Sequence, residues 1–87
     1  MSFRIERSCE STNTILRLSG RIRAVDVKAL QEEIGNEPRL ILDLTGVSVV
    51  DVEIVRFLNV CESRGLRIEN GPSYIKEWMR REREGDQ

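Results

Sequence analysis

The chain has 87 residues, of which 39% are hydrophobic and 33% charged, a balance typical of one globular domain with a single core. Its 14 basic and 15 acidic residues give a net charge of -1, so no overall field draws it onto nucleic acid or anionic lipid. It contains no histidine, which excludes a Ser-His-Asp or Cys-His arrangement within the chain and disfavours most hydrolytic and transfer chemistry.

Targeting signals and cysteines point to an intracellular protein. No positively charged start leads into an apolar run of signal-peptide length, and no stretch approaches the roughly 18 apolar residues of a membrane helix. We therefore expect a cytoplasmic protein with no direct membrane insertion. Cys9 and Cys61 are far apart, form no CxxC motif and lie within apolar patterns, which favours buried free thiols over a disulfide. Two thiols make a very poor metal site, so no metal or cofactor is expected.

The first part of the chain predicts a β-hairpin. From Phe3 to Cys9 apolar and polar side chains alternate, and only Arg7 interrupts the apolar side of the pattern. A polar turn follows at residues 10–13, and a second strand occupies residues 14–19. Gly20 is expected to end that strand.

A helix and a buried strand come next. Residues 26–36 place apolar side chains at i, i+3 and i+7, and the Asp26 carboxylate can cap the first turn. Residues 35–38 stop this helix, because the proline at their end cannot continue the hydrogen-bond ladder. Residues 39–44 form an almost continuous apolar run that ends at Thr45-Gly46. Such a run is typical of a strand that is buried on both faces of a parallel sheet.

The remaining segments predict two more helices and one more strand. A short apolar run at residues 47–50 leads to a second amphipathic helix, which Asp51 caps and Gly65 closes. Residues 66–69 form a short strand, and Pro72 fits the first position of a third helix.

The predicted order is therefore β-β-α-β-α-β-α, a single α/β domain. It spans residues 1–83, and the polar tail at residues 84–87 should fray. Strand-helix-strand units require parallel pairing with right-handed crossovers. We expect a mixed sheet of about four strands packed against the helices.

Three segments together resemble a known family. Residues 16–22 look like a strand-glycine entry to the first helix, residues 40–44 carry Asp43 before the last Leu of a central strand, and residues 49–51 end in Asp. In this order and spacing they resemble the STAS domain, the family of anti-sigma-factor antagonists and of the cytoplasmic domains of sulfate transporters. The resemblance covers nearly the whole chain and implies a non-catalytic regulatory module with a STAS-like fold.

The switch of that family is missing here. In its regulators the Asp is followed by Ser or Thr, the phosphorylated residue at the start of the second helix, and then by a Gly two places on. Val52 takes the place of the hydroxyl residue and Ile54 that of the glycine. Phosphorylation at the family's position is therefore chemically impossible, and a switch that has moved would have to use Thr45 or Ser48.

The resemblance also implies a partner surface. We expect docking on an anti-sigma kinase, a phosphatase or a transporter ATPase through the loop at residues 46–50 and the first turns of the second helix. The expected contact residues are Ser48, Asp51, Val52, Glu53 and Arg56. Alternatives are a small-ligand domain for a nucleotide or lipid, although no glycine-rich loop supports a phosphate site, an accessory subunit of a transporter, or a degenerate enzyme.

Several of these residues have simpler roles open to them. Asp51 can serve as a helix cap alone. Glu53 can be a fixed negative charge in place of a phosphoserine, or a carboxylate that the helix dipole favours. Tyr74 and Trp78 suit core packing or a binding hot spot. Asp43 lies at a strand end, where α/β folds place catalytic groups, but no paired acid or metal cluster accompanies it.

Self-association is a further expectation. Residues 66–69 would lie at the edge of the sheet, because residues 80–87 are too charged to add a strand beside them. This edge and the face around Trp78 therefore predict a weak homodimer.

Overall fold

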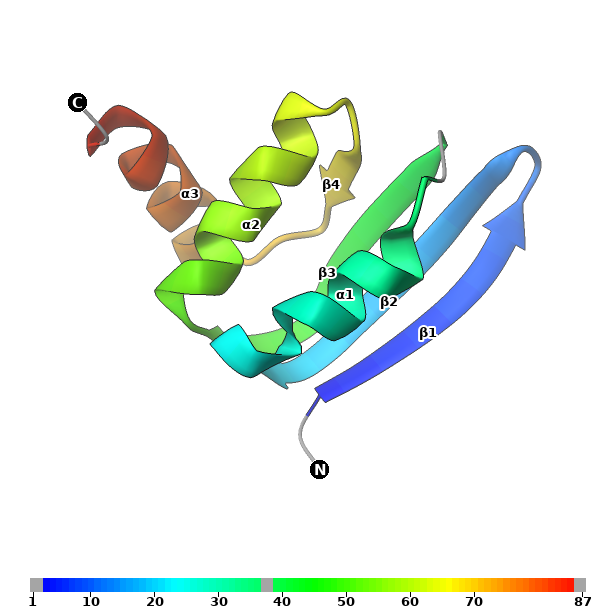
Figure 1. Ribbon diagram of the computed structural model, residues 1–87, viewed down its shortest axis with the longest axis horizontal. Helices are drawn as coiled ribbons and strands as arrows, with labels where there is room; N and C mark the ends of the chain where they lie inside the picture. The colour runs from blue at the N-terminus through cyan, green and yellow to red at the C-terminus, as the bar shows by residue number, and fades with distance from the viewer. Residues whose placement is uncertain (1–2, 37–38, 86–87) are drawn as a thin grey trace.

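Within residues 3–36 and 39–85, which the computed structural model describes, four strands form one mixed sheet that three α-helices and a 3-10 turn accompany (Figure 1). In chain order the elements are β1 (Phe3–Glu10), β2 (Asn13–Ile22), η1 (Ala24–Asp26), α1 (Val27–Ile34), β3 (Leu40–Val50), α2 (Val52–Ser63), β4 (Arg67–Glu69) and α3 (Ser73–Gly85). The predicted α/β class and the order β-β-α-β-α-β-α are confirmed.

The strands lie in the order β1-β2-β3-β4 across the sheet. β1 pairs with β2 antiparallel, while β2 with β3 and β3 with β4 pair in parallel. The two parallel pairs are joined through α1 and α2, which lie beside each other, and α3 packs against α2 (Figure 1). The short strand β4 forms one edge of the sheet, as predicted, and β1 forms the other.

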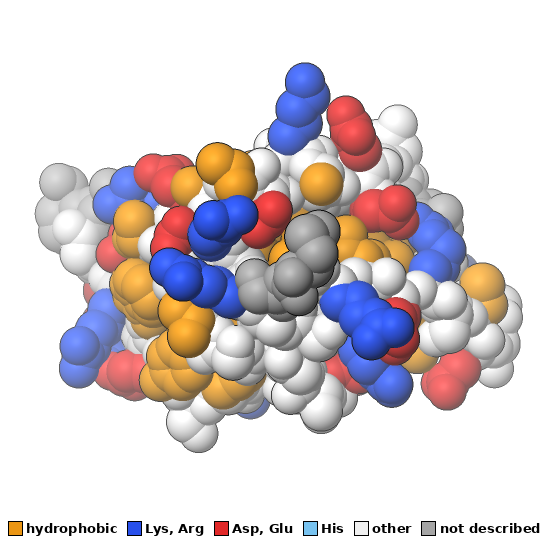
Figure 2. All heavy atoms as spheres, turned by 90° about the horizontal axis from the view of Figure 1, so that it is seen from below, with side chains coloured by type: hydrophobic (Ala, Val, Ile, Leu, Met, Phe, Trp, Pro, Cys, Tyr) orange, Lys and Arg blue, Asp and Glu red, His pale blue; other side chains and the backbone are white. Residues whose placement is uncertain are grey.

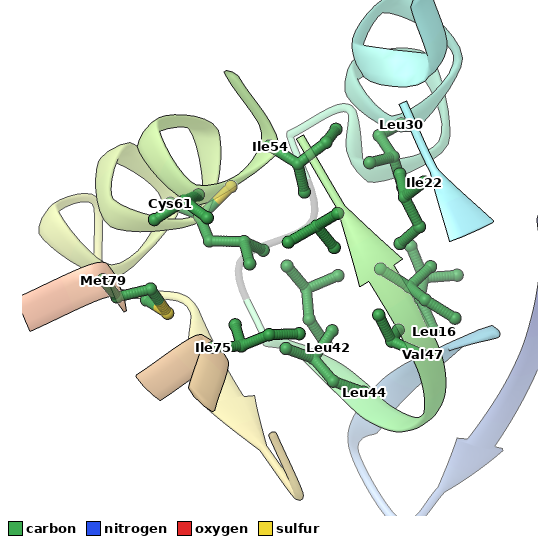
Figure 3. Packing of buried hydrophobic residues seen from close by; sticks show 14 of the residues in the cluster. Leu16, Ile22, Leu30, Leu42, Leu44, Val47, Ile54, Cys61, Ile75 and Met79 are labelled. Atoms are coloured by element: carbon green, nitrogen blue, oxygen red, sulfur yellow. The ribbon is translucent and has the colours of Figure 1, made fainter. Parts of the chain in front are cut away.

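One apolar cluster joins the sheet to all three helices. Figure 3 shows side chains of β2 and β3 meeting side chains from α1, α2 and α3. Leu16 and Leu42 lie opposite each other in the parallel register, so they point to the same face of the sheet. The fully buried side chains are Leu16, Leu18, Ile22, Leu30, Leu42, Leu44, Ile54, Leu58, Ile75 and Val55.

Two predicted strand ends are wrong. β2 continues through Gly20 to Ile22, and β3 continues from Leu40 through Gly46 to Val50. The two strands shift register near both glycines, and Gly20 adopts a φ of 86°, which a residue with a Cβ rarely takes. The glycines therefore lie within irregular but continuous strands. From the sequence alone, a glycine within such a bulge cannot be distinguished from a glycine that ends a strand.

The single charged residue on the apolar side of β1 has a specific role. Arg7 lies opposite Leu16 and so faces the helices. Its guanidinium donates to the main-chain carbonyl of Glu33 at 2.6 Å and lies 3.4 Å from the carboxylate of the same residue. Because α1 ends at Ile34, Arg7 places a positive charge on the carbonyls of its last turn, where the helix dipole favours a cation.

The cysteines differ from each other. Both thiols are free, as predicted, but only Cys61 is buried, and burial raises its pKa to about 11. Cys9 is exposed, so the prediction of a buried thiol is wrong there. It lies near the hairpin end of the edge strand β1, where residues 6–10 are all exposed.

Helix boundaries also correct the sequence predictions. Asp26 does not cap α1, because its carboxylate accepts the Arg23 amide at 2.9 Å and so closes the preceding turn η1. Gly35, with a φ of 52°, follows α1 as expected, while residues 37–38 fall outside the described residues. Pro72 precedes α3 and its carbonyl accepts the first helical amides.

The expected frayed tail is partly helical. α3 extends through Gly85, and Arg80 donates to Glu84 at 2.9 Å one turn along the helix. Residues 86–87 fall outside the described residues. None of the helices in the described chain is long and apolar enough to cross a membrane.

Gly46 provides a test of the pairing between β2 and β3. A Cβ at this position would lie 2.7 Å from the Cβ of Ser19, a contact that only a backbone shift can relieve. Gly46→Ala should therefore lower the free energy of unfolding by about 1–3 kcal/mol, measured by urea denaturation. Ser19→Gly should restore most of the loss. Gly71→Ala is the control, since its Cβ would meet neighbours at 3.5 Å, and equal losses for both alanine variants would contradict the assigned register.

Candidate partner-binding surface at the start of helix α2

The junction between β3 and α2 is tied to the end of β2. Asp51 has an extended backbone, and its carbonyl accepts the Ile54 amide at 3.0 Å as α2 begins. Its own amide donates to the Ile22 carbonyl at 3.2 Å, and its carboxylate accepts the Ala24 amide at 2.8 Å. The predicted side-chain cap is therefore wrong: Asp51 holds α2 against η1, 27 residues earlier in the chain.

The other side of the junction is tied to α3. The hydroxyl of Tyr74 donates a hydrogen bond to the main-chain carbonyl of Ser48. This bond joins the first turn of α3 to the last part of β3, while the Ser48 residue itself is exposed. The junction between β3 and α2 is thus anchored on both sides, by Asp51 toward β2 and η1 and by Tyr74 toward α3.

Three exposed apolar residues belong to the segments that meet at this junction. Val25, Val49 and Tyr74 have exposed fractions of 76%, 50% and 47%. They are three of the four large hydrophobic residues that are exposed within the described chain. Val25 follows Ala24, to which Asp51 binds. Val49 lies two residues before Asp51, and Tyr74 binds Ser48. Together with half-buried Val52 they form the surface named here the junction patch.

On the face drawn in Figure 2, apolar side chains collect on one part of the surface, between charged side chains of both signs. Scattered exposed hydrophobics are ordinary, whereas a gathered set rimmed by polar groups is typical of an interaction surface. The fourth exposed apolar residue, Val60, lies more than two turns along α2 and is 48% exposed.

The predicted contact residues do come together, but they are not all equally available. Ser48, Asp51, Val52, Glu53 and Arg56 lie at the junction or on the first turns of α2. Glu53 is exposed at 3.8 Å from Arg56, whose guanidinium also donates to Glu82 of α3 at 3.0 Å. Arg56 is therefore part of the contact between α2 and α3, and a charge reversal there would also disturb α3.

Sequence reasoning missed one member of the junction patch, Val25, which lies outside the apolar spacing of α1. Val49 belongs to the segment 46–50 that was expected to dock, although it was not named as a contact residue. The pairing of Val49 with Arg21 places both on the face that is not buried, and only the structure reveals this pairing. Of the two aromatic residues considered as binding hot spots, Tyr74 is exposed, whereas Trp78 is half-buried against the core.

Asp43 is a buried structural carboxylate. It accepts the amide of Thr45 at 2.9 Å and the hydroxyl of the same residue, and it lies 3.6 Å from the Arg17 guanidinium. Burial alone would raise the pKa of Asp43, but the two bonds from Thr45, a bond from Asn70 and the charge of Arg17 outweigh it and hold the pKa below its usual value. No group of three or more His, Cys, Asp or Glu that could hold a metal occurs among the described residues.

Two grooves flank helix α2. One, of about 610 Å³, runs between α2 and α3 and is lined by Arg56, Asn59, Val60, Arg81, Glu82, Arg83 and Gly85. The other, of about 470 Å³, lies between the C-terminal parts of α1 and α2, and its apolar lining includes Ile34, Phe57 and Leu66. The arginines of the first groove are matched by acidic partners, since Arg56 contacts Glu82 and Arg83 contacts Glu62.

Thr45 provides a test of the buried carboxylate. Because Asp43 has a lower pKa in the folded chain, its ionised form stabilises the fold above the unfolded-state pKa of about 3.9, and this stabilisation is lost as pH falls through the folded pKa. Thr45→Val removes the hydroxyl donor and should lower the free energy of unfolding at pH 7 by about 1–3 kcal/mol. The loss should shrink in acid.

The conservative variant is the control for this change. Thr45→Ser keeps the hydroxyl and should retain most of the stability at neutral pH. Urea denaturation at pH 7 and in acid measures both variants. A loss for Thr45→Val that is the same at every pH would show that the carboxylate does not depend on Thr45.

Comparison with known proteins does not assign a family. A scan against protein-family models found none that matches this chain, and a search of the curated proteins found no match. The resemblance to the STAS domain therefore stays a prediction from the sequence, while the mixed α/β fold stands on the structure.

Proposed function

We propose that this chain is a non-catalytic protein-interaction module that binds a cytoplasmic protein through the junction patch. The observation that supports this function best is the exposure of three large apolar side chains, Val25, Val49 and Tyr74, in the segments that are tied together at the junction. Large apolar side chains that a small domain leaves exposed together are the usual anchors of a protein interface. The charged side chains of Glu53 and Arg56 would form part of its polar rim.

The anchoring of the junction suits this role. Asp51 binds Ala24 and Ile22, and Tyr74 binds Ser48, so the segments that carry the patch are fixed before any partner arrives. Binding then costs little ordering of loops, which leaves more of the contact energy for affinity. A modest surface can thus support a specific complex.

The resemblance to anti-sigma-factor antagonists suggests the class of partner. An anti-sigma kinase, a phosphatase or a transporter ATPase would dock on the start of α2. Val52 has no hydroxyl, so phosphorylation at that position cannot release the partner. Thr45 and Ser48, the two residues to which the switch could have moved, are both exposed, and the hydroxyl of Thr45 donates to Asp43. We therefore propose a constitutive binding surface, and a phosphate mapped to Ser48 or Thr45 after incubation with a cognate kinase would contradict it.

Substitution of the patch tests the function. Val25→Asp and Val49→Asp should each leave the free energy of unfolding within about 0.5 kcal/mol, since both side chains are exposed. Each should weaken partner binding about tenfold or more, because a charge placed among apolar contacts loses its hydration. The measurement is affinity capture from the native cell with quantification of every retained protein by mass spectrometry.

Val60→Asp is the matched control. It introduces the same charge at a valine of nearly the same exposure, but more than two helical turns from the junction. Proteins that the wild type and Val60→Asp retain, and that both patch variants lose, are specific partners. If all variants retain the same proteins, or if Val60→Asp alone loses them, the interface lies elsewhere and the proposal fails.

A further inference from the structure

The long edge of the sheet is uncovered. β1 has eight residues and pairs with β2 alone, whereas the opposite edge strand β4 has only three. Figure 1 places β1 as the outermost strand, with nothing of the described chain beyond it. An edge strand paired on one side leaves a row of backbone N–H and C=O groups that another strand can use. Phe3 and Ile5, which face the helices, are also only half-buried.

The charges on the other face of the sheet alternate toward this edge. Asp43, Arg17 and Glu6 are direct neighbours on β3, β2 and β1. The ion pair between Arg17 and Asp43 measures 3.6 Å. Across the strands, the charges of this row of neighbours are negative at Asp43, positive at Arg17 and negative at Glu6. A further strand paired with β1 would therefore favour a cation opposite Glu6.

We propose that two copies of this chain pair through β1, antiparallel, with Ile5 opposite the partner's Ile5. In this register Arg4 lies opposite the partner's Glu6, and Glu6 lies opposite the partner's Arg4. Each charged row then continues across the two-fold axis with a further cation beside Glu6, which lies 3.8 Å from Arg4 of its own chain. Because directly opposed residues share a face, the two sheets join into one sheet with the helices of both copies on the same side.

The charges select this register from its neighbours. Two-fold pairing of this kind has a residue opposite itself at the centre, and a one-residue shift of that centre changes every opposed pair. A centre at Arg4, Glu6 or Arg7 would place two like charges against each other. The centre at Ile5 instead places two apolar side chains together and brings the half-buried Phe3 against the stem of the partner's Arg7.

Charge exchange on the full chain tests the pairing. Sedimentation equilibrium at low salt, over a roughly hundred-fold range of concentration, should detect a dimer of the wild type. Glu6→Arg alone and Arg4→Glu alone should each weaken the dimer about tenfold or more, because each places like charges in both opposed pairs. The double variant Arg4→Glu with Glu6→Arg should restore the dimer to within about threefold of the wild type.

One further variant is the matched control. Glu10→Arg makes the same charge change on the same strand as Glu6→Arg, but it lies beyond the paired residues 3–7, so it should leave the dimer unchanged. Circular dichroism should confirm that every variant is folded.

Several results would overturn the proposal. The first is a wild type that stays monomeric at all concentrations. Another is a weaker dimer with Glu10→Arg, or a stronger dimer with Glu6→Arg, since either result would require a different register. The last is a dimer that Trp78→Ala abolishes but Glu6→Arg does not affect, which would place the contact at β4 and α3.

Discussion

The parallel pairing of β2 with β3 places the ends of two distant segments side by side. Ile22 lies opposite Val50, so β2 and β3 end side by side at the same end of the sheet. The segments that follow them, η1 and the start of α2, therefore lie within hydrogen-bonding distance of each other. Asp51 can therefore bind Ala24, although 27 residues separate them. The junction patch is a consequence of this register, because a shift would separate Val25 from Val49. The close approach of Gly46 to Ser19 is part of the same constraint.

Much of the fold was predictable from side-chain periodicity. The alternation in β1, the helical spacing in α2 and the apolar run of β3 each identify an element, since burial imposes a period of two on strands and 3.6 on helices. Their order then fixes parallel crossovers. The wrong predictions concern positions where a contact with a distant part of the chain decides the structure. Gly20 and Gly46 read as strand ends because a turn and a bulge both use glycine, and only the neighbouring strand decides between them.

The candidate site was predictable in place but not in detail. Sequence reasoning put Asp51 at the start of α2, where it does lie, and assigned its carboxylate to the helix amides. The carboxylate instead satisfies an amide of η1, because tertiary structure offers a donor that no local pattern can reveal. The exposure of Val49 and Cys9 likewise depends on which strand faces remain uncovered. Burial is a property of the assembled sheet, so single-strand patterns underdetermine it.

α3 carries both residues that dominate the near-ultraviolet optical properties of the chain. The sequence has one Trp and one Tyr, and both Trp78 and Tyr74 belong to this helix. α3 is joined to the rest mainly through α2, by the bond from Asn59 to the Met79 carbonyl among others, and to the end of β3 through Tyr74. Intrinsic fluorescence therefore reports the docking of one terminal helix, whereas far-ultraviolet circular dichroism reports the whole chain. If α3 detaches before the sheet opens, the two signals will give different unfolding midpoints.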